Sequence, residues 1–195
     1  MEPVTAYIGI GSNVGDRLAW LQQAVDHLSR MPDTSVTGVS RVYMTEPFGD
    51  PDQERYFNAV VEVRTSLDPT DLRALCKAIE HDLGRPDQYR RWSPRTIDLD
   101  ILICGDRCID SDLLVIPHAE MHRRKFVLVP LLDIANPLHP RLRRTIAELL
   151  KSCEDHSVPV RLVERLSFLN KKRNNRSYMT YYRQPSGRHK KNGLP

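Results

Sequence analysis

The spacing of apolar residues changes repeatedly along the first hundred positions of the chain. Alternating apolar residues predict strands over 4–10, 35–44, 57–64 and 97–103. Apolar residues three and four positions apart predict helices over about 17–31 and 69–83. The order strand, helix, strand, strand, helix, strand predicts an α+β fold of the ferredoxin-like βαββαβ type, an antiparallel sheet with its helices on one face.

Local signals at the helix ends agree with this pattern. Asp16 is a plausible N-terminal cap, and Asp68 followed by Pro69 is typical of a helix start. Gly84 stands where a glycine often ends a helix. After the last strand we expect a C-terminal extension with a short hairpin and one or two helices, the last around 145–153.

The positive charge of the chain lies at its C-terminus. Of 195 residues, 29 are Lys or Arg and 25 are Asp or Glu, for a net charge of +4. Residues 166–195 contain basic but no acidic residues, so the preceding part is acidic on balance. We therefore expect one folded domain over 1–165 and a basic, disordered tail over 166–195. Nucleic-acid binding is not indicated, except for a contact of the tail with nucleic acid or another partner as the lesser alternative.

Membrane spanning and secretion are not indicated either. The apolar run at 126–132 is far shorter than the ~20 residues of a membrane helix and contains a proline. The N-terminus lacks a signal-peptide pattern. The cysteines are scattered without a paired motif, which is typical of reduced thiols in a cytoplasmic protein.

Two acids in the fourth predicted strand are the first sign of a functional site. Asp98 and Asp100 are two residues apart, so both carboxylates point to the face opposite the helices. Carboxylates without His or Cys beside them suit Mg²⁺, which usually also binds phosphate oxygens. Two solvated acids on an open sheet face are the alternative. Nearby arginines, Arg85, Arg95 and Arg124, favour a polyphosphate site.

Other residues indicate a pocket for a flat heterocycle. Tyr56 and Asn58 share one strand face and would supply a stacking ring and an amide edge; an ordinary exposed pair is the alternative. The glycines between Gly9 and Gly15 do not match a dinucleotide-binding motif. We interpret them as a loop whose backbone approaches a ligand, with a tight turn as the alternative.

Five blocks of sequence, in order, carry a resemblance to a known family. They are Tyr-Ile-Gly-Ile-Gly-Ser-Asn at 7–13, Thr-Glu-Pro at 45–47, Tyr-Phe-Asn-Ala at 56–59, Arg-Trp-Ser-Pro-Arg-Thr-Ile-Asp-Leu-Asp-Ile-Leu at 91–102 and Pro-His at 117–118. Together they closely resemble the 6-hydroxymethyl-7,8-dihydropterin pyrophosphokinases of folate biosynthesis, over about residues 4–150.

The resemblance implies transfer of pyrophosphate from ATP to the pterin hydroxymethyl group, with release of AMP and with two Mg²⁺ ions as cofactor. It implies catalytic roles for Arg85, Arg95, Asp98, Asp100 and Arg124, of which Asp98 and Asp100 bind the metal. The implied ATP-binding residues are Glu80, Arg85, Trp92, Arg95, Ile101, His118 and Arg124. The implied pterin-binding residues are Gly11, Thr45, Pro47, Phe48, Tyr56, Asn58 and Phe126.

The mechanism that these residues suggest is direct transfer without a covalent intermediate, because positioning and charge neutralisation dominate such reactions. His118 would be a phosphate donor or an acid near the leaving oxygen. Loops 45–55 and 84–96 are long enough to close over the site. Ser93, Leu113 and Ala119 depart from the family pattern.

Two rival functions remain at this point. A ferredoxin-like RNA-binding module would need exposed aromatic residues on its central strands, where this chain has two acids instead. A metal-dependent phosphohydrolase would use the same carboxylates and is excluded less firmly.

Overall fold

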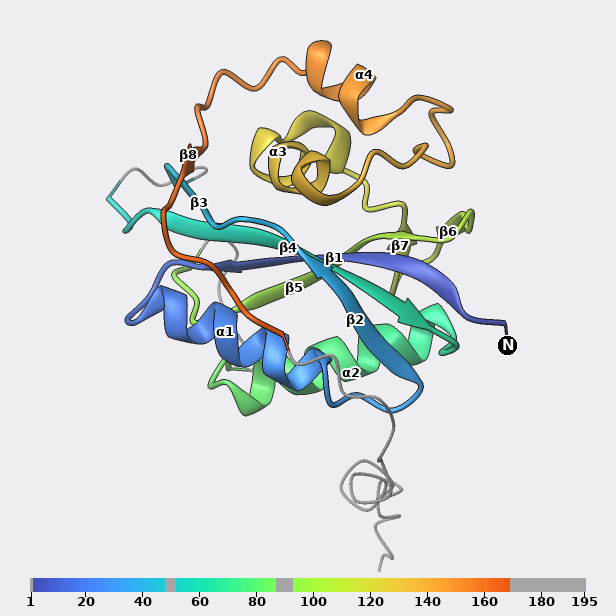
Figure 1. Cartoon of the computed structure of the whole chain (residues 1–195), viewed down its shortest axis with the longest axis horizontal. Helices are drawn as coiled ribbons and strands as arrows, with labels where there is room; N and C mark the ends of the chain where they lie inside the picture. Colours follow the sequence, from blue (N-terminus) through green and yellow to red (C-terminus); the bar gives the residue numbers. More distant parts are fainter. Residues whose placement is uncertain (1, 48–51, 87–92, 169–195) are drawn as a thin grey trace, which may run out of the picture.

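A six-stranded antiparallel sheet forms the centre of the molecule in a computed structural model that describes residues 2–47, 52–86 and 93–168 (Figure 1). Its strands are β1 (Val4–Ser12), β2 (Thr34–Val39), β3 (Tyr43–Thr45), β4 (Tyr56–Thr65), β5 (Asp98–Cys104) and β8 (Val160–Arg161). β1 lies between β4 and β5, while β2 and β3 both pair with β4, and β8 pairs with β3. The α+β class and the antiparallel sheet are confirmed.

Helices α1 (Arg17–Leu28) and α2 (Pro69–Asp82) lie side by side on one face of this sheet (Figure 1). The cap predictions are confirmed, because the Asp16 side chain accepts the Ala19 N–H and the Asp68 side chain accepts the Thr70 N–H. Gly84 follows α2 with φ of 83°, a conformation that favours glycine. Both predicted helices therefore begin where their sequence signals place them.

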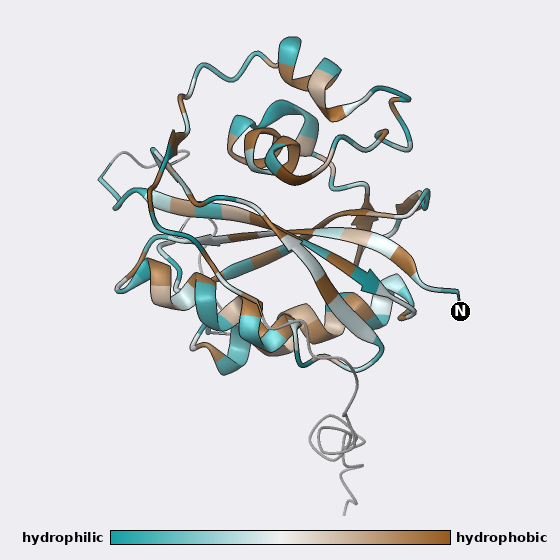
Figure 2. Cartoon of the chain, in the orientation of Figure 1, coloured by the Kyte–Doolittle hydropathy of each residue, from teal (hydrophilic) through white to brown (hydrophobic). Residues whose placement is uncertain are grey.

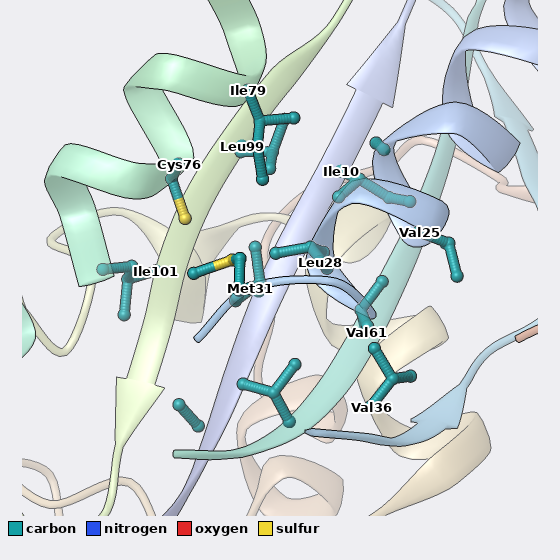
Figure 3. Packing of buried hydrophobic residues seen from close by; sticks show 14 of the residues in the cluster. Ile10, Val25, Leu28, Met31, Val36, Val61, Cys76, Ile79, Leu99 and Ile101 are labelled. Atoms are coloured by element: carbon teal, nitrogen blue, oxygen red, sulfur yellow. The ribbon is translucent and has the colours of Figure 1, made fainter. Parts of the chain in front are cut away.

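The first core fills the space between these helices and the sheet (Figure 3). Cys76 and Ile79 of α2 point toward Leu99 and Ile101 of β5. In Figure 2, hydrophobic residues (brown) of α1 and α2 lie toward the sheet, and hydrophilic residues (teal) lie on the outer side of these helices. The helical spacing of the apolar residues thus gives each helix one buried face.

A second core covers the opposite face of the sheet. It is formed by η1 (Met121–Arg123), α3 (Lys125–Ile134) and α4 (Ile146–Lys151), which lie above the sheet in Figure 1. Leu128 and Leu131 of α3 pack against Val60 and Leu102 of the sheet. The two helices of the predicted strand–helix pattern thus share one face, and the C-terminal extension, for which no face was predicted, is part of the folded core on the other face.

Two strand predictions also differ from the structure. The strand expected over 35–44 is divided into β2 and β3, and between them the Ser40 hydroxyl accepts the Val60 N–H at 2.9 Å. In β5 the alternation of side chains predicts that Ile103 faces α1 and α2, as Leu99 and Ile101 do. The pairing with β1 shifts register, however, and Ile103 joins the second core. A bulge of this kind reverses the face of every following side chain.

The expected hairpin is present as β6 (Ile109–Asp110) and β7 (Val115–Ile116). After β8 the chain crosses the sheet edge to the α1 side (Figure 1), where the Gln22 amide donates to the Ser167 carbonyl at 2.8 Å. The chain thus still contacts α1 after residue 165. From residue 169 on, the tail that we expected to be disordered lies outside the described residues. No helix in the described part is long and apolar enough to cross a membrane.

Candidate active site

A cavity of about 110 Å³ opens on the second face of the sheet, between the central strands and the start of α3. The predicted site residues that line it are Gly11, Thr45, Tyr56, Asn58, Arg95, Asp98, Asp100, His118, Arg124 and Phe126. Residues from widely separated parts of the sequence therefore meet at one place.

The glycines of β1 lie directly opposite the two acids. Gly11 pairs with Asp98 and Gly9 pairs with Asp100 across the β1–β5 ladder. Because glycine has no side chain, β1 leaves the space beside both carboxylates open. Gly9 and Gly11 belong to a strand rather than to the loop that we expected, whereas Gly15 lies in the loop after β1 with φ of 63°.

Asp98 is held by a buried network of charges. Its Oδ1 accepts a hydrogen bond from Arg85 Nη1, and its Oδ2 accepts one from Arg95 Nη1 at 2.8 Å. Burial alone would raise the pKa of Asp98, but the charges of the two arginines outweigh it and hold that pKa below its ordinary value. Asp98 is therefore a carboxylate at neutral pH.

Glu80 supports this network from behind. Its Oε1 lies 2.8 Å from Arg85 Nη1 and accepts the Leu99 N–H at 2.7 Å, while Lys77 donates to both carboxylate oxygens. Burial raises the pKa of Glu80 above its ordinary value, against the opposing charge of Lys77. The side chain of Glu80 thus fixes both Arg85 and the first residues of β5.

Asp100 completes the acidic pair. Burial and the neighbouring charge of Asp98 raise the pKa of Asp100, while His118 acts in the opposite direction. Two carboxylates on one strand face repel each other, so a cation between them would stabilise the charged form of both.

The residues present fit Mg²⁺, which proteins commonly bind through one or two carboxylates together with phosphate oxygens and water. Both carboxylates line the cavity, and the β1 residues paired with them are glycines. The Nε atom of Arg95 is buried without a hydrogen-bond partner among the described residues, and it is a free donor for an anion beside the acids.

The part of the cavity where the sequence predicts a flat heterocycle contains an oriented amide. Asn58, which is 7% exposed, donates from Nδ2 to Thr45 Oγ1 at 2.8 Å. This contact leaves its Oδ1 and its second N–H for a ligand. Tyr56 and Phe126 also line the cavity, and the Arg124 guanidinium lies 5.7 Å from the centre of the Phe126 ring.

Asn13 is a site residue that the sequence reasoning missed. Its side chain is 1% exposed, and its Oδ1 accepts the Arg95 N–H at 2.8 Å. Its Nδ2 donates to Gln53 Oε1 at 3.0 Å. Asn13 therefore connects the segment that carries Arg95 with the loop before β4. Its position in the Gly-Ser-Asn block was the only available signal.

Several predicted residues do not line the cavity. Glu80 and Arg85 lie behind Asp98, and the side chain of Ile101 packs in the first core toward α2 (Figure 3), so only its backbone remains available to a nucleotide. Pro47 is described but is not part of the lining. Phe48 and Trp92 lie outside the described residues, as do parts of both loops expected to close.

The three residues that depart from the family pattern lie outside the cavity lining. Leu113 is 67% exposed, Ala119 is exposed, and Ser93 is half-buried, and none of them lines the cavity. These substitutions leave the described cavity lining unchanged.

Paired carboxylates, one of them bonded to two arginines, next to an aromatic pocket with an oriented amide, are features of enzymes that transfer phosphate groups. Comparison with known proteins identifies the family. Residues 7–136 match the 7,8-dihydro-6-hydroxymethylpterin-pyrophosphokinase (HPPK) family, and the chain belongs to this family. It is a pyrophosphokinase of folate biosynthesis, a transferase.

Curated relatives carry the same activity in their names. The 2-amino-4-hydroxy-6-hydroxymethyldihydropteridine pyrophosphokinase of Bacillus subtilis is 46% identical over 129 residues, which cover 66% of this chain and 77% of the relative. The enzyme of the same name from Haemophilus influenzae is 40% identical over 155 residues, which cover 80% of this chain and 96% of the relative.

Solved structures share the fold at much lower identity. Plasmodium falciparum HPPK-DHPS, crystallised with pterin and p-hydroxybenzoate, superimposes with a TM-score of 0.61 at 17% identity. The match covers 78% of this chain and 42% of that chain, so this chain spans less than half of the length of that protein.

Proposed function

We propose that the enzyme transfers pyrophosphate from ATP to the hydroxymethyl group of 6-hydroxymethyl-7,8-dihydropterin and releases AMP in one direct, in-line step. The observation that carries this proposal is the position of Asp98 and Asp100, side by side on the cavity wall, with Arg95 on one side and Asn58 in the same cavity. One pocket thus offers a polyphosphate site and a heterocycle site together.

Asp98 and Asp100 would hold Mg²⁺, with two ions expected when ATP is present. Bound there, Mg²⁺ would neutralise the triphosphate charge and orient the oxygens for transfer. Arg95 and Arg124, both in the cavity lining, would bind the phosphate groups and stabilise the charge that moves to AMP. Arg85 would act from behind Asp98, and His118 would donate to a phosphate oxygen.

The pterin would lie between Tyr56 and Phe126, with its polar edge against Asn58. Because Thr45 occupies one N–H of this amide, Asn58 presents one acceptor and one donor to the ring. Gly11 would let the ring approach the floor of the pocket. Positioning of the hydroxymethyl group against the triphosphate would supply much of the rate enhancement, and no side chain is needed as a nucleophile.

Three further proposals concern the whole molecule. The strand order β5-β1-β4-β2, all antiparallel, supports a ferredoxin-like core for residues 4–104. The four free cysteines favour a cytoplasmic location. Residues 1–165 would form the catalytic domain and residues 166–195 a basic extension.

An assay with ATP, Mg²⁺ and 6-hydroxymethyl-7,8-dihydropterin tests the function. AMP that forms only when the pterin is present is the expected product. Release of inorganic phosphate without pterin would instead indicate a phosphohydrolase, and tight RNA binding without either reaction would indicate a binding module.

A further inference from the structure

The start of α3 carries two residues of the cavity and is held from outside the helix. Arg124 precedes α3, Phe126 lies in its first turn, and both line the cavity. Between them, the backbone N–H of Lys125 donates to Asp155 Oδ2 at 2.8 Å. Asp155 comes from the segment after α4 and lies beyond the 7–136 range of the family match.

This contact replaces a cap that α3 does not supply itself. The N-cap residue is Arg124, whose side chain makes no capping hydrogen bond. An Asp carboxylate is a favoured partner at a helix N-terminus, because it accepts from unpaired N–H groups and complements the helix dipole. Asp155 therefore caps α3 from 30 residues away in the sequence.

The first turn of α3 lacks one of the usual helical hydrogen bonds. Pro130 lies inside the helix and has no N–H, so the Phe126 carbonyl lacks its usual helical donor. The residue before the helix, Arg124, has an extended backbone with φ of −127° and ψ of 107°. The position of this turn thus depends more than usual on contacts outside the helix.

Asp155 is itself well fixed. Its second oxygen, Oδ1, accepts the Ser157 N–H at 2.8 Å. Burial would raise the pKa of Asp155, but its hydrogen bonds with Ser157 and Lys125 outweigh this and hold the pKa below its ordinary value. The carboxylate is therefore charged and stationary at neutral pH.

We propose that Asp155 is a positioning residue, which fixes the start of α3 so that Phe126 and Arg124 face the substrates. The proposal rests on the proposed function, in which Phe126 stacks on the pterin. Asp155 does not line the cavity and acts only through the Lys125 amide. The C-terminal segment thereby contributes to substrate binding without touching the substrate.

The test compares Asp155→Ala with Glu148→Ala in the full chain. Glu148 is the matched control, because it accepts the Thr145 N–H at 2.8 Å at the start of α4 and does not line the cavity. We expect Asp155→Ala to weaken pterin binding about tenfold, measured by fluorescence titration, which is the usual effect of losing a hydrogen bond to a charged group. Glu148→Ala should lower the melting temperature similarly but leave pterin binding unchanged.

Two further variants separate positioning from general destabilisation. Asp155→Asn keeps one of the two acceptor oxygens and should recover part of the binding and of the stability. In a Phe126→Ala background, Asp155→Ala should cause little additional loss, because the residue through which it acts is already gone. The proposal would be overturned if Asp155→Ala and Glu148→Ala bind pterin equally well. It would also be overturned if Asp155→Ala weakens pterin binding as strongly in the Phe126→Ala background as in the wild type. Failure of the wild type to bind pterin at all would instead overturn the proposed function.

Discussion

The Oδ1 atom of Asn58 lies 2.9 Å from the point that a Cβ atom on Gly11 would occupy. Side chains do not approach a Cβ atom so closely, so Gly11→Ala must displace the Asn58 amide. Because Thr45 already fixes this amide, the displacement would misalign its remaining donor and acceptor. We expect Gly11→Ala to weaken pterin binding by ~10–100-fold, the cost of misplaced buried hydrogen bonds, while ATP binding is largely kept.

Gly9→Ala is the matched control for this prediction. A Cβ atom at Gly9 would lie 3.4 Å from the end of the Leu102 side chain, which is an ordinary van der Waals contact. Its effect on the pterin dissociation constant should be much smaller. Equal losses in the two variants would show that the Gly11–Asn58 contact does not control pterin binding.

Asn13→Ala should impair catalysis more than it impairs the fold. The substitution removes the acceptor of the Arg95 N–H and the link to Gln53. A buried donor left without a partner costs about 1–3 kcal/mol, and Arg95 would lose its fixed position beside Asp98. We expect kcat to fall at least about tenfold, since small misplacements of a charged group have large effects on rate.

Asn136→Ala provides the comparison for Asn13→Ala in steady-state assays. Asn136 Oδ1 accepts the Ala147 N–H at 2.9 Å, in a place remote from the cavity lining. Its kcat should stay at the wild-type value. A normal kcat for Asn13→Ala would contradict the positioning role of this amide.

His139 should make the stability of the second face depend on pH. It is 4% exposed, and burial together with the neighbouring His122 and Arg141 lowers its pKa. Between the lowered pKa of the folded state and the ordinary value near 6.5, the unfolded chain binds more protons. The contribution of His139 therefore destabilises the fold as the pH falls below about 6.5.

Thermal unfolding of His139→Gln across pH 5–8 checks this prediction. The variant should lose less stability between pH 7.5 and 5.5 than the wild type does, whatever its stability at pH 7.5. The exposed His81 serves as the control position, and His81→Gln should follow the wild-type curve. Parallel curves for His139→Gln and the wild type would refute the assignment.

The parts of the site that sequence reasoning predicted are those set by local rules. Asp98 and Asp100 share a face because strand side chains alternate, and Asp16 and Asp68 cap helices because their side chains reach the next N–H groups. Each of these inferences needs only neighbouring residues. The same holds for Tyr56 and Asn58, which share a face of β4.

The parts that it missed depend on contacts between distant segments. Asn13 contacts Gln53 and Arg95, which are 40 and 82 residues away. The face on which α3 packs could not be predicted, because residues 126–132 are apolar on all sides and show no helical stripe. The bulge in β5 depends on its pairing with β1, which the sequence of β5 alone does not specify.

The rate of AMP formation by Asp100→Asn, with saturating ATP, Mg²⁺ and pterin, tests the central claim most directly. The exchange removes the charge of one carboxylate in the cavity at nearly constant volume. We predict a rate lower by roughly three orders of magnitude, as for the loss of a group that stabilises transition-state charge, with an unchanged circular dichroism spectrum. Asp106→Asn, in the exposed turn after β5, should retain the wild-type rate. A rate for Asp100→Asn within about tenfold of the wild type would contradict the metal-binding role of the acidic pair.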